Sequence, residues 1–380
     1  MMLTRDYQIC RRCVMDTTAS SIRFDEEGIC HFCTEAREVL DHLASSVETQ
    51  AKAFEAVLRL RRKKKKSEYD AVFGLSGGID SSFLLVKLVE AGLSPLVVHL
   101  DNGWNSNLAV QNIERLVKRL KLDLYTHVLD WREFSALQVS FLKASVPDGE
   151  IPTDHAIIAA LYQTADKFGI PLVIMGHNVQ TESIHPPEWS RGHFDWKYIR
   201  RVHQKFSNVP LKSFPRLSYP RKLYYRFVRK ITPMKAFNGV EYNRAEALKI
   251  LEERYGFVPY DGKHNESTYT KFFQGHVLPT KFYIDKRRAH VSSLIVSGQI
   301  SREEALREIS HPAIDPGTLE NDIAYVKKKL SLSDAEYREI WEAPVKSIAD
   351  YPNSLRVERI FGKISYLLSR ISRSDRHRWA

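Results

Sequence analysis

The segment Ser76 to Ser82, with the sequence SGGIDSS, combines residue types that bind phosphate. Its glycines allow an anion to approach the backbone closely, and a helix that starts there adds partial positive charge to the backbone amides. The chain has no G-x-x-x-x-G-K-[ST] motif and no G-x-G-x-x-G turn. The segment therefore predicts an anion site of a different kind from those loops. The alternative is a glycine turn that only closes a strand-helix unit.

All four cysteines lie near the N-terminus, in two C-x-x-C pairs formed by Cys10, Cys13, Cys30 and Cys33. Two such pairs at this separation predict a structural zinc ribbon with four thiolate ligands, and residues 24–29 predict a strand, turn and return between them. An iron-sulfur cluster or a redox pair is the alternative. Because no cysteine follows Cys33, sulfur transfer by a catalytic cysteine of the chain is hard to support.

Strands and helices alternate after residue 68, which predicts a parallel sheet. Strands are expected at 69–75, 95–100, 122–128 and 171–175, and helices at 82–89, 108–120 and about 153–168. Ligands of such sheets bind beyond the carboxyl ends of the strands. Three segments should therefore converge: the Ser76 loop, Asp101 to Gly103, and Gly176 to Asn178.

The chain has 380 residues and a net charge of +11, which suits an anionic partner such as tRNA, a nucleotide-sugar or a membrane surface. Cations are concentrated at 59–66, 191–235 and 370–378. Within the second segment, Leu223, Phe227 and Ile231 have helical spacing, which predicts a basic amphipathic helix or an ordinary surface helix. The sequence has no long apolar run and no signal-peptide core at its start, so we expect a cytoplasmic protein with at most peripheral membrane contact.

The Ser76 loop resembles the pyrophosphate loop of the PP-loop ATP pyrophosphatase superfamily, which cleaves ATP to AMP and pyrophosphate. The resemblance implies an ATP site and a magnesium pair, Asp80 and Glu182, since Gly176 to Glu182 is similar to the G-[TH]-N-x-x-x-E segment of amide-forming members. Glu182 is also suited to complementing a helix dipole, and His177 to packing. The implied ATP-binding residues are Leu75, Ser76, Gly77, Gly78, Asp80, Ser81, Ser82, His99, Leu100, Asp101, Gly176, His177 and Asn178.

Residues 262–306 place many cations, histidines and amides among aromatic side chains, which suits an anionic, hydroxyl-rich ligand. A charged helical subdomain is the alternative. With the ribbon and the loop, the segments K-H-x-E-S-T-Y-T and L-P-x-K-F…D-K-R-x-A-H-x-S-S-L-I-x-S-G-Q resemble the N-acetyl sugar amidotransferases of bacterial surface-polysaccharide synthesis, of the LPS O-antigen type.

This resemblance implies an α/β fold with a doubly wound parallel sheet of the adenine-nucleotide α-hydrolase-like (PP-loop) type, a four-cysteine zinc ribbon and a mostly helical C-terminal region. We expect a ribbon with its following helix at 1–50, an ATP-binding domain at 67–190, a substrate-binding region at 191–310, and a helical region with a basic tail at 311–380.

The implied reaction uses ATP to adenylate an acetamido oxygen of a nucleotide-sugar, after which ammonia forms an acetamidine. Ammonia is expected from a separate glutaminase, with a possible channel subunit. The candidate catalytic residues are Asp80, Lys271, Lys281, His264 and Glu266, with Lys263, Arg287 and His290 as candidate substrate contacts. The alternatives are a PP-loop tRNA-modifying enzyme, either a thiolase or a lysidine-synthetase-like ligase, and a nucleotide-binding scaffold. Nucleic acid is the less favoured partner.

Overall fold

The computed structural model describes residues 6–43, 55, 68–260 and 266–357. The predictions for Lys263, His264 and the basic segments 59–66 and 370–378 lie outside the described residues. In the part of the chain that is described, every helix is too short or too polar to cross a lipid bilayer.

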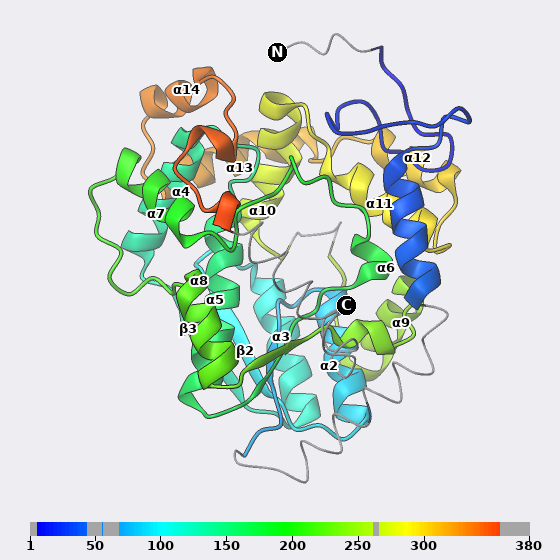
Figure 1. Cartoon of the computed structure of the whole chain (residues 1–380), viewed down its shortest axis with the longest axis vertical. Helices are drawn as coiled ribbons and strands as arrows, with labels where there is room; N and C mark the ends of the chain where they lie inside the picture. The colour runs from blue at the N-terminus through cyan, green and yellow to red at the C-terminus, as the bar shows by residue number, and fades with distance from the viewer. Residues whose placement is uncertain (1–5, 44–54, 56–67, 261–265, 358–380) are drawn as a thin grey trace.

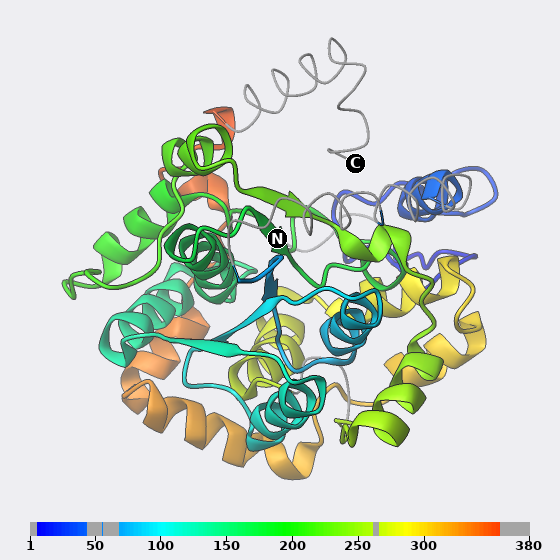
Figure 2. The same ribbon diagram turned by 90° about the horizontal axis from the view of Figure 1, so that it is seen from below.

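A parallel sheet of five strands is the centre of the fold (Figures 1 and 2), which confirms the predicted fold class. The strand order is β3-β2-β1-β4-β5, and the register pairs Val72 of β1 with Leu96 on one side and Val173 on the other. The strands are β1 Val72–Gly74, β2 Leu96–Asp101, β3 Leu124–Val128, β4 Leu172–Ile174 and β5 Thr232–Met234. The order reverses between β1 and β4, which is the point where doubly wound sheets bind ligands.

Helices cover both faces of the sheet because the buried strands present apolar side chains alternately to each face. One face packs against α2 Ile79–Glu90 and α3 Asn107–Leu120, and α9 Arg244–Tyr255 packs on these two helices. The other packs against α5 Ile151–Lys167 and the helical segment formed by α8 Tyr219–Leu223 and the π-helical η1 Tyr224–Val228. The four predicted strands and three predicted helices are all present, whereas α4 Trp131–Ala144 and the short β5 were not predicted.

The C-terminal region is mostly helical, as predicted, and shares an apolar core with α4, α7 Trp196–Phe206 and the N-terminal ribbon. Residues 31–43 form a helix that begins within the second cysteine pair and lies beside α11 and α12 (Figure 1). The remaining elements are α6 Val179–Glu182, η2 Ala236–Gly239, α10 Thr268–Phe272, η3 Phe273–Phe282, α11 Lys286–Val296, α12 Arg302–Ser310, α13 Pro316–Lys329, α14 Asp334–Glu342 and η4 Ile348–Asp350.

A buried carboxylate fixes the segment between α7 and α8. Glu133 of α4 accepts hydrogen bonds from the backbone N–H groups of Lys212, Ser213 and Phe214 at 2.9–3.0 Å. Burial alone would raise the pKa of Glu133, but these hydrogen bonds outweigh it and lower the pKa below its usual value. The ionised form is therefore the one that stabilises the fold, and this contribution is lost as the pH falls through the lowered pKa.

Replacing Glu133 with glutamine should lower the free energy of unfolding by about 2–3 kcal/mol at pH 7. The glutamine side chain would place its NH2 group, a hydrogen-bond donor, against backbone N–H groups that are also donors. Urea denaturation of both proteins measures this difference. Glu114→Gln, at an exposed position of α3, is the matched control and should change stability by less than about 0.5 kcal/mol. Equal effects of the two substitutions would contradict the anchoring role of Glu133.

Candidate active site

The Ser76 loop joins β1 to α2 at the point where the strand order reverses. Gly77 has φ +89°, a left-handed conformation that favours glycine. The Ser76 and Ser81 hydroxyls lie 3.0 Å apart, and Ser76 Oγ also accepts the Gly78 N–H at 3.2 Å. Gly78 begins α2 without a side-chain cap, so the first-turn amides and two hydroxyls face the same region. This arrangement can bind an anion such as pyrophosphate.

Residues distant in the sequence close around this loop. A Cβ atom at Gly176 would lie 3.0 Å from Ser81 Cβ, so the end of β4 is packed directly against the loop. Tyr260 donates a hydrogen bond of 2.9 Å to the Gly77 carbonyl. A Cβ atom at Gly78 would lie 3.3 Å from Glu266 Oε1, which places the Glu266 carboxylate beside the loop. The structure therefore brings Glu266, a candidate catalytic residue, beside the Ser76 loop.

Asp80 lies in the first turn of α2, and each of its carboxylate oxygens accepts a hydrogen bond from a hydroxyl group. Thr181 of α6 donates to Oδ2 at 3.1 Å, and Tyr242 donates to Oδ1. Burial raises the pKa of Tyr242 most, and the charges of Asp80 and Glu182 raise it further. The Tyr242 hydroxyl thus stays protonated and lies within electrostatic range of both carboxylates of the predicted magnesium pair. Two carboxylates are the hard oxygen ligands that magnesium prefers.

Glu182 ends the short helix α6, which follows β4 through Gly176 to Asn178. Its Oε2 lies 3.2 Å from Nδ1 of His177, and this hydrogen bond is the main reason that the pKa of His177 is raised. Asn178 accepts the Gln180 N–H at 3.0 Å and so caps α6. Of the predicted nucleotide residues after β4, His177 and Asn178 therefore hold α6 in place.

The end of β2 forms the other side of the site. His99 is buried; its Nδ1 donates to the Leu75 carbonyl at 3.1 Å, and its Nε2 accepts from Asn105 at 3.0 Å. Burial lowers the pKa of His99, so the neutral ring links the start of the Ser76 loop to the segment after β2. Beyond it, a cavity of about 320 Å³ is lined by residues that include Asp101, Trp131 and Lys329.

A second charged cluster surrounds the start of α5. Asp148 and Glu150 are buried, and Lys286 Nζ of α11 lies 3.6 Å from Glu150. Loss of hydration, followed by the charges of Asp148 and Glu150, raises the pKa of Asp154 to about 8, against the opposing charges of Lys286 and His177. Burial would lower the pKa of Lys286, but the three carboxylates outweigh it. His177 thus lies within electrostatic range of both Asp154 and Glu182.

The raised pKa of Asp154 predicts a pH-dependent cost to stability. An aspartate has a pKa near 4 when unfolded, so between about pH 4 and 8 the unfolded chain loses a proton that folded Asp154 keeps. Folding stability therefore falls by up to roughly 1.4 kcal/mol per pH unit from this group. Asp154→Asn should remove this slope and gain stability relative to the wild type as the pH rises from 5 to 8. Denaturation curves at three pH values test this; a difference that does not change with pH would contradict it.

The four cysteines form a metal-binding centre. All are fully buried, and their sulfur atoms lie within 4.8 Å of one another, at 3.8 Å between Cys10 and Cys33 and 3.7 Å between Cys13 and Cys30. A tetrahedral ion with metal-sulfur bonds of about 2.3 Å requires sulfur separations near 3.8 Å. The sulfurs therefore fit a single tetrahedral ion, and all four cysteines are free of disulfides.

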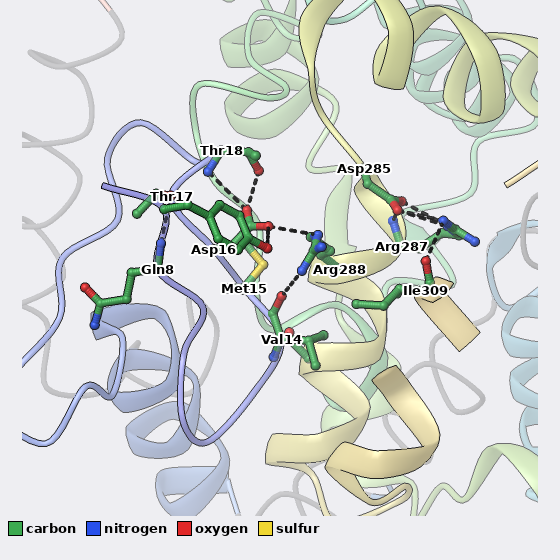
Figure 3. A network of polar contacts seen from close by, with 12 residues as sticks. Gln8, Val14, Met15, Asp16, Thr17, Thr18, Asp285, Arg287, Arg288 and Ile309 are labelled. Carbon is green, nitrogen blue, oxygen red and sulfur yellow. Dashed lines mark hydrogen bonds and ion pairs between the residues drawn. The ribbon is translucent and has the colours of Figure 1, made fainter. Parts of the chain in front are cut away.

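The ribbon is held against α11 and α12. Arg288 pairs with the buried carboxylate of Asp16 at 3.1 Å and donates to the Val14 carbonyl at 2.8 Å (Figure 3). Arg302 donates to the carbonyls of Cys13 and Cys10 at 3.0 and 3.1 Å. Both arginines thus bind the backbone of the first cysteine pair or of the residues that follow it, which fixes the ribbon to the helical region.

Other contacts of α11 reach α6 and the residues just after it. Ser293 accepts the Ile184 N–H at 3.0 Å, and His290 Nδ1 donates to the Thr181 carbonyl at 3.1 Å. His290 therefore holds the residue whose hydroxyl binds Asp80, and its contact with substrate stays a prediction. The ribbon, α11, α6 and Asp80 form one continuous set of contacts.

The C-terminal part of the chain is similar to a known protein family. Residues 266–363 match the family model of the "LPS biosynthesis protein WbpG-like, C-terminal domain". We call residues 266–363 the WbpG-like domain, after the family model to which they are similar. This WbpG-like domain contributes Glu266 at the loop, Lys286 at the acidic cluster and His290 at α6. A comparison with curated proteins found no match.

Three solved structures are similar at low identity. The NH3-dependent NAD synthetase from Campylobacter jejuni subsp. jejuni NCTC 11168, in complex with the nitrate ion, is 14% identical over 80% of this chain and 98% of that chain, with a TM-score of 0.32. The NMN synthetase from Francisella tularensis is 14% identical over 79% and 98%, with a TM-score of 0.31. The U34-tRNA thiolase NcsA from Methanococcus maripaludis, with its [4Fe-4S] cluster, is 11% identical over 83% and 91%, with a TM-score of 0.33. Because these identities and TM-scores are low, the site is described from the contacts of this chain alone.

Three candidate site residues within the WbpG-like domain have partners in the fold. Lys271 pairs with Asp322 of α13 at 2.7 Å. Lys281 donates to the carbonyls of Ile340, Trp341 and Ala343, so the buried ammonium caps the end of α14. Arg287 is held by Asp285 and by carbonyls at 308, 309 and 311. The positive charges of these residues satisfy neighbouring acceptors of the fold, and no contact with the Ser76 loop was found for them among the described residues.

The sequence interpretation missed the aromatic hydroxyls of Tyr242 and Tyr260 and the roles of Thr181, Asp154 and Lys286. Tyr242 is 162 residues from Asp80, and Tyr260 is 183 residues from Gly77. Neither tyrosine belongs to a local motif, so spacing alone offered no signal for them. Thr181 lies inside the segment Gly176 to Glu182 and was the one hydroxyl that the motif made accessible to prediction.

Proposed function

We propose that the protein is an ATP-dependent amidotransferase that converts an acetamido group of a nucleotide-activated sugar to an acetamidine, in surface-polysaccharide (LPS O-antigen) biosynthesis. The observation that carries this proposal is the position of Glu266. This carboxylate belongs to the WbpG-like domain and lies beside Gly78 of the anion-binding loop. A sugar held by that domain would therefore meet the phosphates of ATP at the Ser76 loop.

The chemistry follows from the poor leaving ability of an amide oxygen. The acetamido oxygen attacks the α phosphorus of ATP, an oxygen-phosphorus bond forms, and the bond from that phosphorus to pyrophosphate breaks. Ammonia then adds its electron pair to the imidate carbon and loses a proton, and the carbon-oxygen bond breaks with AMP leaving. In this scheme the amides of the first turn of α2, with the Ser76 and Ser81 hydroxyls, bind the departing pyrophosphate.

Asp80 and Glu182 would hold magnesium, which supplies positive charge against the phosphate oxygens. Thr181 and Tyr242 orient the Asp80 carboxylate, and His177 orients that of Glu182. The ribbon would hold zinc in a structural role, because four sulfur ligands would fill all four coordination positions of the ion. All cysteines of the chain are in this ribbon, so a separate glutaminase, acting with a possible channel subunit in the cytoplasm, is the proposed source of ammonia.

The direct test incubates the purified protein with ATP, magnesium, ammonium and a nucleotide-linked diacetamido-uronic acid. AMP and pyrophosphate should be released in equal amounts, and mass spectrometry should detect a slightly lighter sugar because an oxygen is replaced by an imino group. Glu266→Gln serves as the site variant, and it should reduce turnover while the circular dichroism spectrum is unchanged. Turnover of bulk tRNA without turnover of such sugars would reject the proposal in favour of a tRNA-modifying enzyme.

A further inference from the structure

The segment between Asp195 and Glu241 contains no acidic residue. It carries twelve lysines and arginines, and ten of them are exposed: Lys197, Arg200, Arg201, Lys205, Lys212, Arg216, Arg221, Arg229, Lys230 and Lys235. A stretch of this length with only positive charges creates a positive potential that attracts an anionic surface. The proposed nucleotide-sugar chemistry at the Ser76 loop does not use these side chains.

Apolar side chains project from the centre of this cationic segment. We call Leu223, Tyr224, Phe227 and Val228, together with the flanking cations Arg221, Arg229 and Lys230, the α8 surface. Phe227 and Val228 are 66% and 65% exposed, and Leu223 and Tyr224 are 38% and 41% exposed. Their spacing of four residues places Leu223 with Phe227, and Tyr224 with Val228, on the same side of the helical segment.

The structure also corrects the amphipathic pattern expected from the sequence. Ile231 is buried beyond the end of the helical segment and does not continue the exposed row. Tyr225 is fully buried and stacks on Tyr162 of α5, with ring centroids 5.6 Å apart. Tyr225 therefore anchors the segment to the α/β domain, while the apolar residues around it face outward.

We propose that the α8 surface docks the protein on an anionic lipid bilayer. Cations at the rim would lie near lipid phosphates, and Phe227 and Val228 would enter the boundary between headgroups and acyl chains. Charge complementarity favours an anionic surface, and the exposed apolar side chains favour a bilayer over a nucleic-acid backbone, which offers them no apolar environment. Docking would keep an enzyme of surface-polysaccharide synthesis at the membrane, although the proposal does not depend on that activity.

The test is co-sedimentation of the full chain with vesicles of phosphatidylcholine alone or with added phosphatidylglycerol. Binding should require the anionic lipid and weaken as salt rises. Arg229→Gln with Lys230→Gln should lower the partition coefficient about 10- to 30-fold, since each cation near an anionic surface contributes about one factor of five. Phe227→Ser with Val228→Ser should also weaken binding. The ion pair of Arg229 with Asp166 is exposed, so its loss should leave the fold intact.

Matched controls lie elsewhere on the surface. Lys118→Gln with Arg119→Gln removes an adjacent exposed lysine and arginine from α3, and Val345→Ser removes an exposed valine, 57% accessible, from a loop. Both should bind vesicles as the wild type does. Equal loss with the controls would show attraction by net charge alone and overturn the proposal. Binding that ignores lipid charge, or binding only to RNA or to a partner protein, would also overturn it.

Discussion

Replacing Asp80 with asparagine should reduce the rate of AMP and pyrophosphate release by at least about 100- to 1000-fold, the scale seen when a group that stabilises developing charge is removed. Asparagine keeps the shape of the side chain and one acceptor oxygen for Thr181 or Tyr242, but it loses the negative charge that a magnesium ligand requires. The loss should therefore be in catalysis and not in folding. Pyrophosphate release and the melting temperature, measured on the same preparation, separate the two.

Two further variants make the Asp80 result specific. Tyr242→Phe removes one hydroxyl from the carboxylate and should cost about 10-fold or somewhat more, because outer partners of a metal ligand affect its orientation. Glu90→Gln alters a carboxylate at the far end of the same helix and should leave the rate unchanged. Near wild-type turnover by Asp80→Asn would reject the metal role and, with it, the assignment of the Ser76 loop as the site of ATP cleavage.

Replacing Cys30 with serine should abolish stoichiometric metal binding and destabilise the ribbon. Metal binding in small four-ligand sites contributes about 10–16 kcal/mol of apparent free energy that is coupled to folding. Without it, the carbonyls of Cys10 and Cys13 would no longer be presented to Arg302, and the shared core with the helical region would lose its N-terminal part. Metal analysis should give about one zinc per wild-type chain and much less for the variant.

Met15→Leu is the matched control for the ribbon. Met15 is fully buried beside the cysteines and contains sulfur, but it lies outside the cluster of four ligands. A volume-conserving change there should retain the metal and cost less than about 1.5 kcal/mol. Thermal melts with and without a chelator compare the proteins. Wild-type protein that lacks metal, or a melting temperature unaffected by Cys30→Ser, would contradict a structural metal centre.

Local sequence patterns determined much of the fold. The glycines and hydroxyls of the Ser76 loop, the two cysteine pairs and the apolar strands are recognisable because backbone conformation and burial period are set by residues close in the chain. They predicted the anion site, and they predicted correctly the cluster of four cysteines and four of the five strands that the structure describes. Strand β5 has only three residues, one of which is Pro233, and is too short to show such a pattern.

Tertiary structure alone decided which side chains surround the Ser76 loop. Tyr242 reaches Asp80 because α9, which begins two residues after it, packs against α2. Glu266 reaches Gly78 because its carbonyl accepts the Ser106 N–H and Ser267 pairs with Asn105, and no local spacing encodes those contacts. Tertiary packing also gives the Lys281 ammonium three carbonyl acceptors, which the sequence did not predict. The sequence by itself predicted where an anion and a metal would bind. Packing decided which partner each charged side chain has, because a buried polar group in a folded protein forms hydrogen bonds with the groups that lie within reach.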